Sequence, residues 1–287
     1  MIIIRSTDLS AEIDPLGAQL SALRDGAGRN LLWNGDPQWW AGRAPVLFPI
    51  VGSLAGGTYL YGSKRYALSR HGFARGKPFE TVAATPTTAM FKLRADDTTR
   101  AVYPFEFELE MRFALQGSTL TATATVRNSG DRELPASLGF HPGFRWPLPY
   151  DQPRDTHFIE FETDEPAPAR RIDADGLLSP DAIPTPIAHR RLALTDALFE
   201  KDVVIFDRIK SRTVRYGAPR GPQIAIRFPD AQYLGVWTRP GAPFVCIEPW
   251  QGITDPAHFS ADIRQKPGIF SIAPGAAHAL SMAISLV

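Results

Sequence analysis

The sequence predicts an all-β protein made of many short strands, and two observations support that prediction. Residues 105–126 alternate between apolar and polar side chains, which is the period of a strand with one buried face. Proline makes up 26 of the 287 residues, nearly twice its usual share of about 5%. Because proline interrupts helices but is tolerated in turns and at sheet edges, this density favours strands over helices.

Turn residues separate the predicted elements along the chain. Residues 1–33 predict short strands, and 59–67 predict a hairpin around a Gly-Ser turn. In 105–126 the alternation continues on both sides of a Gln-Gly-Ser turn, which predicts an antiparallel hairpin with one wet face. One of the few helical candidates is 195–201, about two turns with Thr195 as the N-cap. Further strands are expected at 203–207, 213–216, 223–228, 232–238, 243–248 and 278–286.

The chain is long enough for one large core, and we expect a single domain over residues 1–287. Region 147–190 is rich in proline and charge, but no change of composition follows it, so we interpret it as long connections within that domain. The formal net charge is +1, which gives no sign of nucleic-acid or membrane binding. Cys246 is the only cysteine, and the apolar start is too short for a signal peptide or a membrane span, so a cytoplasmic protein is expected.

Several chemistries are disfavoured by motifs that the chain lacks. The six histidines show no HExxH or other compact metal-binding spacing, so we expect no metal ion. Residues 52–57 have the glycine spacing of a phosphate-binding loop, but Thr58 stands where that motif requires lysine. No G-x-S-x-G motif is present, and Cys246 in an apolar strand is better interpreted as a core residue than as a nucleophile.

The stretch 69–79 concentrates functional side chains between predicted strands. It combines His71 with three cationic side chains and two glycines, which permit a sharp turn and the close approach of a ligand. Arg75 can offer bidentate hydrogen bonds to hydroxyl, carboxylate or phosphate oxygens. The alternative interpretation is an ordinary basic loop with a half-buried histidine.

Two later stretches have the same character. His141 ends a predicted strand and Pro142 biases its backbone to be extended, so its imidazole is either a proton-transfer group or a structural residue. On the strand near residue 246, Phe244, Cys246 and Glu248 share one face, which places a carboxylate on an enclosed surface. Glu248 is then either a general base or the partner of an arginine.

Tryptophans accompany these stretches. Residues 31–40 hold three of the six tryptophans, and an indole can close a hydrophobic contact, stack on a sugar or cover a pocket rim. For most of the three we favour the hydrophobic contact. Trp250 lies two residues after Glu248 and is expected to contact a ligand.

Three segments together resemble the aldose 1-epimerase (galactose mutarotase-like) superfamily: His71–Arg75 (HGFAR), Gly139–Pro142 (GFHP) and Cys246–Trp250 (CIEPW). The apolar run at 44–52 and the Trp39-Trp40 loop resemble in particular its LacX-type branch. The similarity extends in the right order from about residue 31 to 255. It implies a large twisted antiparallel β-sandwich with a sugar cleft on its concave face, and it implies chemistry that needs no cofactor.

The resemblance also implies roles for individual residues. Glu248 matches the general base that takes the proton from the anomeric hydroxyl, and His141 matches the general acid that protonates the ring oxygen. His71 matches a substrate-holding histidine, and Asp202 is the best match to a substrate-binding aspartate. Ring opening, rotation and reclosure would then interconvert the α and β anomers of a free hexose such as glucose or galactose. Mutual attraction would favour an ionised Glu248 beside a protonated His141.

The sequence leaves the substrate open. Relatives commonly carry arginine where this chain has Ser53, which affects one sugar or backbone contact. The hexose-6-phosphate epimerase branch uses arginines near the positions of Arg43 and Arg75 to bind phosphate, so a phosphosugar is the second interpretation. A non-catalytic sugar-binding sandwich is the third. The expected partner is a small sugar or sugar phosphate, bound by a monomer or homodimer.

Overall fold

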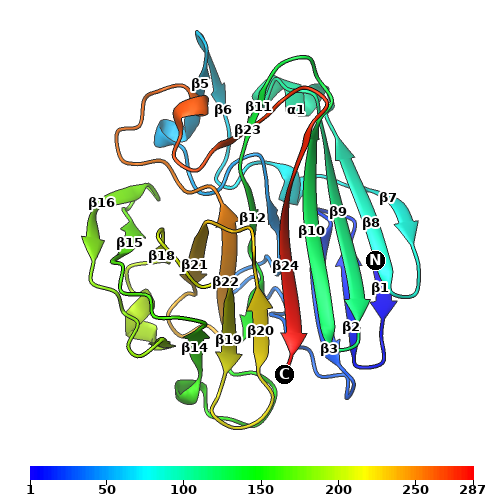
Figure 1. Ribbon diagram of the computed structural model, residues 1–287, viewed down its shortest axis with the longest axis vertical. Helices are drawn as coiled ribbons and strands as arrows, with labels where there is room; N and C mark the ends of the chain where they lie inside the picture. Colours follow the sequence, from blue (N-terminus) through cyan, green and yellow to red (C-terminus); the bar gives the residue numbers. More distant parts are fainter.

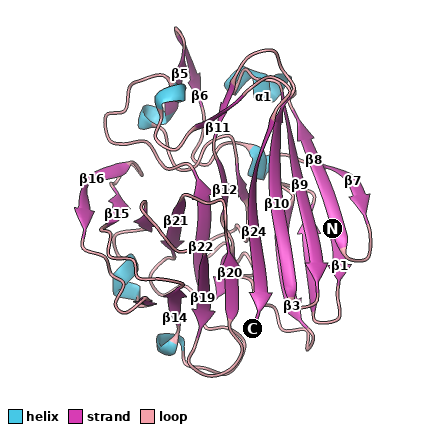
Figure 2. Cartoon of the chain, in the orientation of Figure 1, coloured by secondary structure: helices cyan, strands magenta, loops and turns pink.

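The structure, a computed structural model, describes all residues from 1 to 287, and almost every element in it is a strand (Figures 1 and 2). The strands of the first half are β1 (Ile2–Arg5), β2 (Leu9–Asp14), β3 (Gln19–Asp25), β4 (Val46–Leu47), β5 (Thr58–Tyr61), β6 (Lys64–Ala67), β7 (Glu80–Ala84), β8 (Thr88–Arg94), β9 (Phe107–Gln116), β10 (Thr119–Asn128), β11 (Leu134–Ala136), β12 (Leu138–Phe140) and β13 (Gly143–Arg145). Those of the second half are β14 (Phe158–Phe161), β15 (Ala169–Ile172), β16 (Leu178–Ile183), β17 (Arg191–Ala193), β18 (Val204–Phe206), β19 (Thr213–Gly217), β20 (Ile224–Arg227), β21 (Tyr233–Trp237), β22 (Phe244–Gln251), β23 (Phe270–Ile272) and β24 (Ala277–Leu286). The helices are α1 (Asp97–Val102) and five short 3₁₀ turns, η1 (Ala55–Gly57), η2 (Ala74–Gly76), η3 (Arg154–Thr156), η4 (Asp196–Phe199) and η5 (Ile263–Gln265).

Two large antiparallel sheets make up most of the molecule. The first has nine strands in the order β17-β14-β19-β20-β24-β10-β9-β8-β7. The second has the order β16-β15-β18-β21-β22-β12-β4, and β13 pairs with β22 beside this path. A three-stranded sheet, β1-β2-β3, and two strand pairs, β5-β6 and β11-β23, complete the arrangement. The expected antiparallel β-sandwich is confirmed.

The main core lies between the two large sheets. It is one cluster of 62 buried residues, and it includes Met111 and Phe113 of β9 together with Val245 and Ile247 of β22. Each such side chain contributes roughly 1.5–3 kcal/mol when it is removed from water. Because both sheets supply residues to the same cluster, the apolar periodicity of their strands determines which face of each sheet points inward.

The two hairpins predicted from the sequence are present. β9 and β10 pair around the turn with Gln116 opposite Thr119, and β24 continues the sheet on the other side of β10. Figure 1 shows β8, β9, β10 and β24 as long neighbouring strands. The β5-β6 hairpin also forms, with Tyr61 opposite Lys64.

Strand β22 separates the core from a second, smaller buried surface. All eight of its residues are buried. Val245 and Ile247 join the main core, whereas Phe244 and Cys246 pack on the opposite face with tryptophans. Glu248 follows the alternation onto the second face, as the sequence predicted.

Two local predictions differ from the structure, and one helix was not predicted. The helix expected at 195–201 is the single 3₁₀ turn η4, although Thr195 does cap it by accepting a hydrogen bond from the amide of Leu198. Helix α1 was not predicted, because it is only six residues long and its signal is the capping box of Asp96 and Thr99. Region 147–190 holds β14, β15 and β16 as well as connections. None of the helices has the length and hydrophobicity needed to cross a bilayer.

Candidate active site

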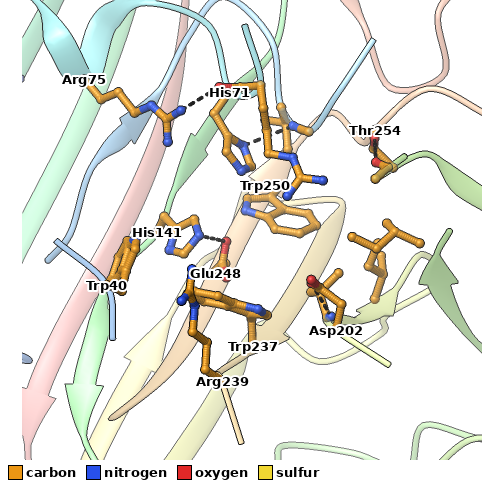
Figure 3. Close-up of a pocket in the computed structure, with 17 residues that line it drawn as sticks. Trp40, His71, Arg75, His141, Asp202, Trp237, Arg239, Glu248, Trp250 and Thr254 are labelled. Carbon is orange, nitrogen blue, oxygen red and sulfur yellow. Dashed lines mark hydrogen bonds and ion pairs between the residues drawn. The ribbon is translucent and has the colours of Figure 1, made fainter. Parts of the chain in front are cut away.

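The register of the second sheet brings His141 and Glu248 together. β12 and β13 both pair with β22, and Gly143 of β13 lies opposite Cys246. The same register, extended by two residues into the gap between β12 and β13, places His141 opposite Glu248. The two side chains are buried and meet at 3.2 Å, between His141 Nε2 and Glu248 Oε2 (Figure 3).

Burial opposes the charged form of both groups. Desolvation lowers the pKa of His141 well below its usual value and raises the pKa of Glu248, to which the negative charge of Asp202 adds. The indole of Trp250 offsets part of the shift at Glu248. Burial by itself therefore favours a neutral imidazole beside a protonated carboxyl, whereas mutual attraction favours the charged pair expected from the sequence. Both forms hold the same number of protons, so moving one proton across the contact converts one into the other.

Indole rings enclose the imidazole of His141. Its ring centroid lies 4.9 Å from that of Trp40 and 5.7 Å from that of Trp237. Figure 3 shows the three side chains. Trp40 also stacks on Phe244 at 5.6 Å, so this tryptophan both packs on apolar side chains and lines the site. Trp33 has a structural role instead, because its Nε1 donates a hydrogen bond to the carbonyl of Trp40 at 2.7 Å and so holds the loop together. Trp237 was not identified from the sequence, because its place beside His141 depends on strand pairing.

His71 is held in a specific tautomer by the backbone. The amide of Gly52 donates to His71 Nδ1 at 3.1 Å, so the proton of the neutral ring lies on Nε2. Burial, followed by the positive charge of His141, Arg75 and Arg70, lowers the pKa of His71. The residue has φ of 66°, in the left-handed region that non-glycine residues rarely adopt. His71 is therefore a neutral Nε2–H donor on the pocket wall, held at a strained backbone position.

The loop that positions His71 is itself clamped by the end of β22. The amide of Ser53 donates to Thr254 Oγ1 at 3.0 Å, and the amide of Ala55 donates to Asp255 Oδ2 at 2.9 Å. Asp255 is buried and paired at 2.5 Å with the ammonium group of Lys266, which is also buried. Residues 52–57, which the sequence showed to be no phosphate-binding loop, use these amides to fix the site instead.

Three arginines lie on the rim of the site, and none of them has a carboxylate partner. Arg70 Nε donates to Ser53 Oγ at 2.8 Å, and an Arg75 nitrogen donates to the carbonyl of Arg70 at 2.9 Å. Arg239 lies near Trp237 in Figure 3. Ser53, where the resemblance implied an arginine, thus accepts a hydrogen bond from the guanidinium of Arg70.

Asp202 reaches the opposite side of the pocket from a strained loop. Its φ is 62°, and Arg171 holds the turn by donating to the backbone carbonyl of Asp202 at 2.7 Å. Its Oδ1 accepts from the amide of Val203 at 2.7 Å, while the side chain remains exposed to the pocket. Asp202 is available as a hydrogen-bond acceptor for a ligand.

Six of the seven side chains singled out from the sequence line one pocket of about 250 Å³, namely His71, Arg75, His141, Asp202, Glu248 and Trp250. Arg43 does not line it. Its Nε donates to the backbone carbonyl of Asn34 at 2.7 Å, so its guanidinium supports the tryptophan loop instead. The lining residues not identified beforehand include Trp237, Arg239, Ile172 and Gly176, which carry no motif of their own. An open groove of about 840 Å³ adjoins the pocket and shares Arg70, Asp202, Trp237 and Arg239 with it.

One group of side chains has the composition of a metal site. His141, Cys246 and Glu248 each offer a ligand atom, and these three atoms lie within 4.8 Å of one another. Burial, followed by the charge of Glu248, raises the pKa of the Cys246 thiol, which agrees with its interpretation as a core residue and not a nucleophile.

Comparison with known proteins decides the family. The sequence profile described as "Aldose 1-epimerase" matches residues 1–272. The chain belongs to the aldose 1-epimerase family. Within that family it is similar to the protein LacX of Lactococcus lactis subsp. lactis, with 28% identity over 281 residues, which is 94% of each chain.

Two solved structures of this family share the whole fold. A galactose mutarotase-like protein from Lactobacillus casei superposes with a TM-score of 0.93 at 29% identity and covers 100% of both chains. A galactose mutarotase related enzyme from Lactobacillus acidophilus has a TM-score of 0.91 at 28% identity, covering 100% of this chain and 97% of its own. The resemblance that the HGFAR, GFHP and CIEPW segments predicted is therefore confirmed, and family membership supports an enzyme of the epimerase kind.

Proposed function

We propose that the protein is an aldose 1-epimerase that interconverts the α and β anomers of a free hexose, with Glu248 as the general base and His141 as the general acid. The observation that supports this most is the 3.2 Å contact of a carboxyl and an imidazole on the wall of a small pocket. Its volume of about 250 Å³ is near the lower end of the range for ligand sites. A single sugar ring is the matching ligand.

The spacing of the pair suits this reaction. Mutarotation moves protons at the anomeric hydroxyl and at the ring oxygen, and both oxygens are bonded to C1. The acid and the base must therefore lie side by side, as His141 and Glu248 do. A glycosidase instead needs two carboxyl groups at least about 5 Å apart across the scissile bond.

The proton steps follow from the pair. Glu248 takes the proton of the anomeric hydroxyl while His141 Nε2–H gives a proton to the ring oxygen. The bond between C1 and the ring oxygen breaks and the aldehyde forms. This leaves a protonated Glu248 and a neutral His141, which is the form that burial favours. After rotation about C1–C2, Glu248 gives its proton to the aldehyde oxygen while neutral His141 takes the proton of the hydroxyl that closes the ring on the other face, which restores the starting pair.

The remaining lining residues suit the rest of the sugar. His71 presents an Nε2–H donor, Asp202 an acceptor, and Trp40 and Trp237 present apolar ring surfaces that sugar C–H faces can contact. Hydrogen bonds at the hydroxyls orient the ring so that C1 meets the acid–base pair.

A second candidate is a hexose phosphate, and the unpartnered arginines favour it. Arg70, Arg75 and Arg239 all line the pocket, and the hydrogen bonds that Arg70 and Arg75 donate go to neutral oxygens. Guanidinium groups bind phosphate in bidentate fashion. The phosphosugar interpretation first invoked Arg43, but that side chain is used elsewhere.

Anomeric exchange measured by NMR on glucose, galactose and glucose 6-phosphate tests both candidates. We expect wild type to accelerate exchange and Glu248→Gln to lose at least roughly 100-fold, the usual contribution of a general base. Arg43→Lys serves as a control outside the pocket, whereas Arg70→Lys should weaken only the phosphosugar. Full activity in Glu248→Gln would refute the assignment. Broadened sugar signals without exchange in wild type would indicate a non-catalytic binding protein.

A further inference from the structure

The acid–base pair has a third neighbour that the proposed reaction does not use. Cys246 precedes Glu248 by two residues on β22, so both side chains lie on the same face of the strand. Its sulfur, a nitrogen of His141 and an oxygen of Glu248 lie within 4.8 Å of one another. We propose that these three side chains form a binding site for a borderline-soft divalent cation, of which Zn²⁺ is the type, and that the bound cation inhibits the enzyme.

The spacing of the pair matches tetrahedral coordination. Two ligands about 2.0–2.1 Å from a tetrahedral zinc ion are about 3.3 Å apart. His141 Nε2 and Glu248 Oε2 are already separated by 3.2 Å. A sulfur ligand at about 2.3 Å would lie roughly 3.6 Å from the other two, which is within the 4.8 Å that spans the three ligand atoms here.

The polar atoms of the pair also lack other partners. Apart from the 3.2 Å contact with His141, Glu248 Oε2 is buried without a hydrogen-bond partner, and Nδ1 of His141 has no partner either. Cys246 is fully buried beside the same pair. A cation would give this oxygen the partner that it lacks, and two of the three ligands, His141 and Glu248, line the pocket through which a cation would enter.

Charge balance makes the bound state compatible with burial. A thiolate and a carboxylate together neutralise a divalent cation, and the imidazole remains neutral, so the complex carries no net charge into the buried site. The mixed sulfur, nitrogen and oxygen set selects zinc or cobalt over magnesium and calcium, which require several oxygen ligands. Arg70 and Arg75 oppose a cation from the rim, so we expect weaker binding than in structural zinc sites.

The sequence did not reveal this group because its members come from two distant segments. His141 lies between β12 and β13, and Cys246 and Glu248 lie on β22, so no compact motif exists. A cation here would engage the proton donor and the proton acceptor at once. Inhibition therefore rests on the proposed function, whereas binding does not.

Cobalt substitution tests binding without any need for catalysis. Wild-type protein, kept reduced, is titrated with Co²⁺, and we expect one ion per chain and a thiolate-to-cobalt charge-transfer band in the near ultraviolet. Zn²⁺ should displace the cobalt and abolish the band. Cys246→Ala, with Cys246→Ser as a second variant should the first fail to fold, should show no band.

Exchange kinetics test the inhibition. Zn²⁺ should inhibit wild type competitively with sugar, and chelation should reverse the inhibition. In each protein the inhibition is measured relative to that protein's own metal-free rate. The inhibition constant should be at least tenfold higher in the Cys246 variant than in wild type. Absence of the band in wild type overturns the site. A band with no inhibition, or inhibition equally strong without Cys246, overturns the three-ligand assignment. If the protein catalyses no exchange, the cobalt band alone decides.

Discussion

At the scale of single residues, the proposed reaction needs the acid and the base in their charged forms, whereas burial favours the neutral form of each. His141 and Glu248 lie in contact among indole rings, and His71 is held as a neutral donor by the amide of Gly52. The HGFAR, GFHP and CIEPW segments allowed these residues to be identified from the sequence. Trp237 and Arg239 could not be found in that way, because strand pairing and a turn bring them to the pocket.

His71→Asn tests the donor role of this side chain. Asparagine tolerates a left-handed backbone, so the φ of 66° should be retained, but the Nε2–H that faces the pocket is lost. We expect KM for the sugar to rise about tenfold, equivalent to roughly 1.4 kcal/mol, with a smaller change in kcat. Steady-state exchange kinetics give the split between the two constants. An unchanged KM with an unchanged thermal midpoint would show that His71 does not hold the substrate.

At the scale of elements, strand β22 connects the core to the site. One face of it joins the main core through Val245 and Ile247, and the other carries Glu248 and Trp250. The alternation was visible in the sequence, and so was the β9-β10 hairpin. The clamp that Thr254 and Asp255 form after the strand could not be predicted from the sequence. Asp255 and Lys266 are ordinary charged residues there, and their burial depends on how the loops pack.

The buried Asp255–Lys266 pair should be essential to this clamp. Lys266→Met leaves the Asp255 carboxylate buried without its cation, and we expect the free energy of unfolding to fall by about 3–5 kcal/mol. Urea denaturation measures the loss. Adding Asp255→Asn removes the stranded charge and keeps an acceptor for the amide of Ala55, so the double variant should recover part of the stability. Equal stability of wild type and Lys266→Met would contradict the clamp.

At the scale of the whole molecule, the two sheets share one large core, and we propose that residues 1–287 unfold as one cooperative unit. The all-β class followed from alternation and proline content, and the sandwich was implied by the resemblance, whereas the order of strands in the two sheets was not predicted, because it depends on pairing between segments far apart in the chain. Arg43 shows that a role implied by a resemblance does not always apply to this chain. The resemblance implied a phosphate-binding arginine near this position, but the guanidinium of Arg43 donates to a backbone carbonyl outside the pocket.

The molecule should lose stability as the pH falls from 7.5 to 5.5. Burial lowers the folded-state pKa of four histidines, at positions 71, 141, 157 and 278. Unfolded histidines take up protons near pH 6.5, so the unfolded state binds more protons and gains as the pH falls. Glu248 acts in the opposite direction because burial raises its pKa. Over this window a fully suppressed histidine loses about 1.4 kcal/mol and Glu248 regains up to about 2.7 kcal/mol, so the net loss is at most on the order of 2–3 kcal/mol, measurable by urea denaturation at the two pH values. A stability that rises on acidification would contradict these burial shifts.

The central claim is that His141 and Glu248 act as one proton-transfer unit. The most direct test is a double-mutant comparison of anomeric exchange in wild type, His141→Gln, Glu248→Gln and the variant with both changes, using the sugar that wild type prefers. If the pair acts as a unit, each single change should remove at least roughly 100-fold of the rate, and the double variant should be little slower than either. Losses that multiply in the double variant, or a single variant that keeps the wild-type rate, would contradict the claim.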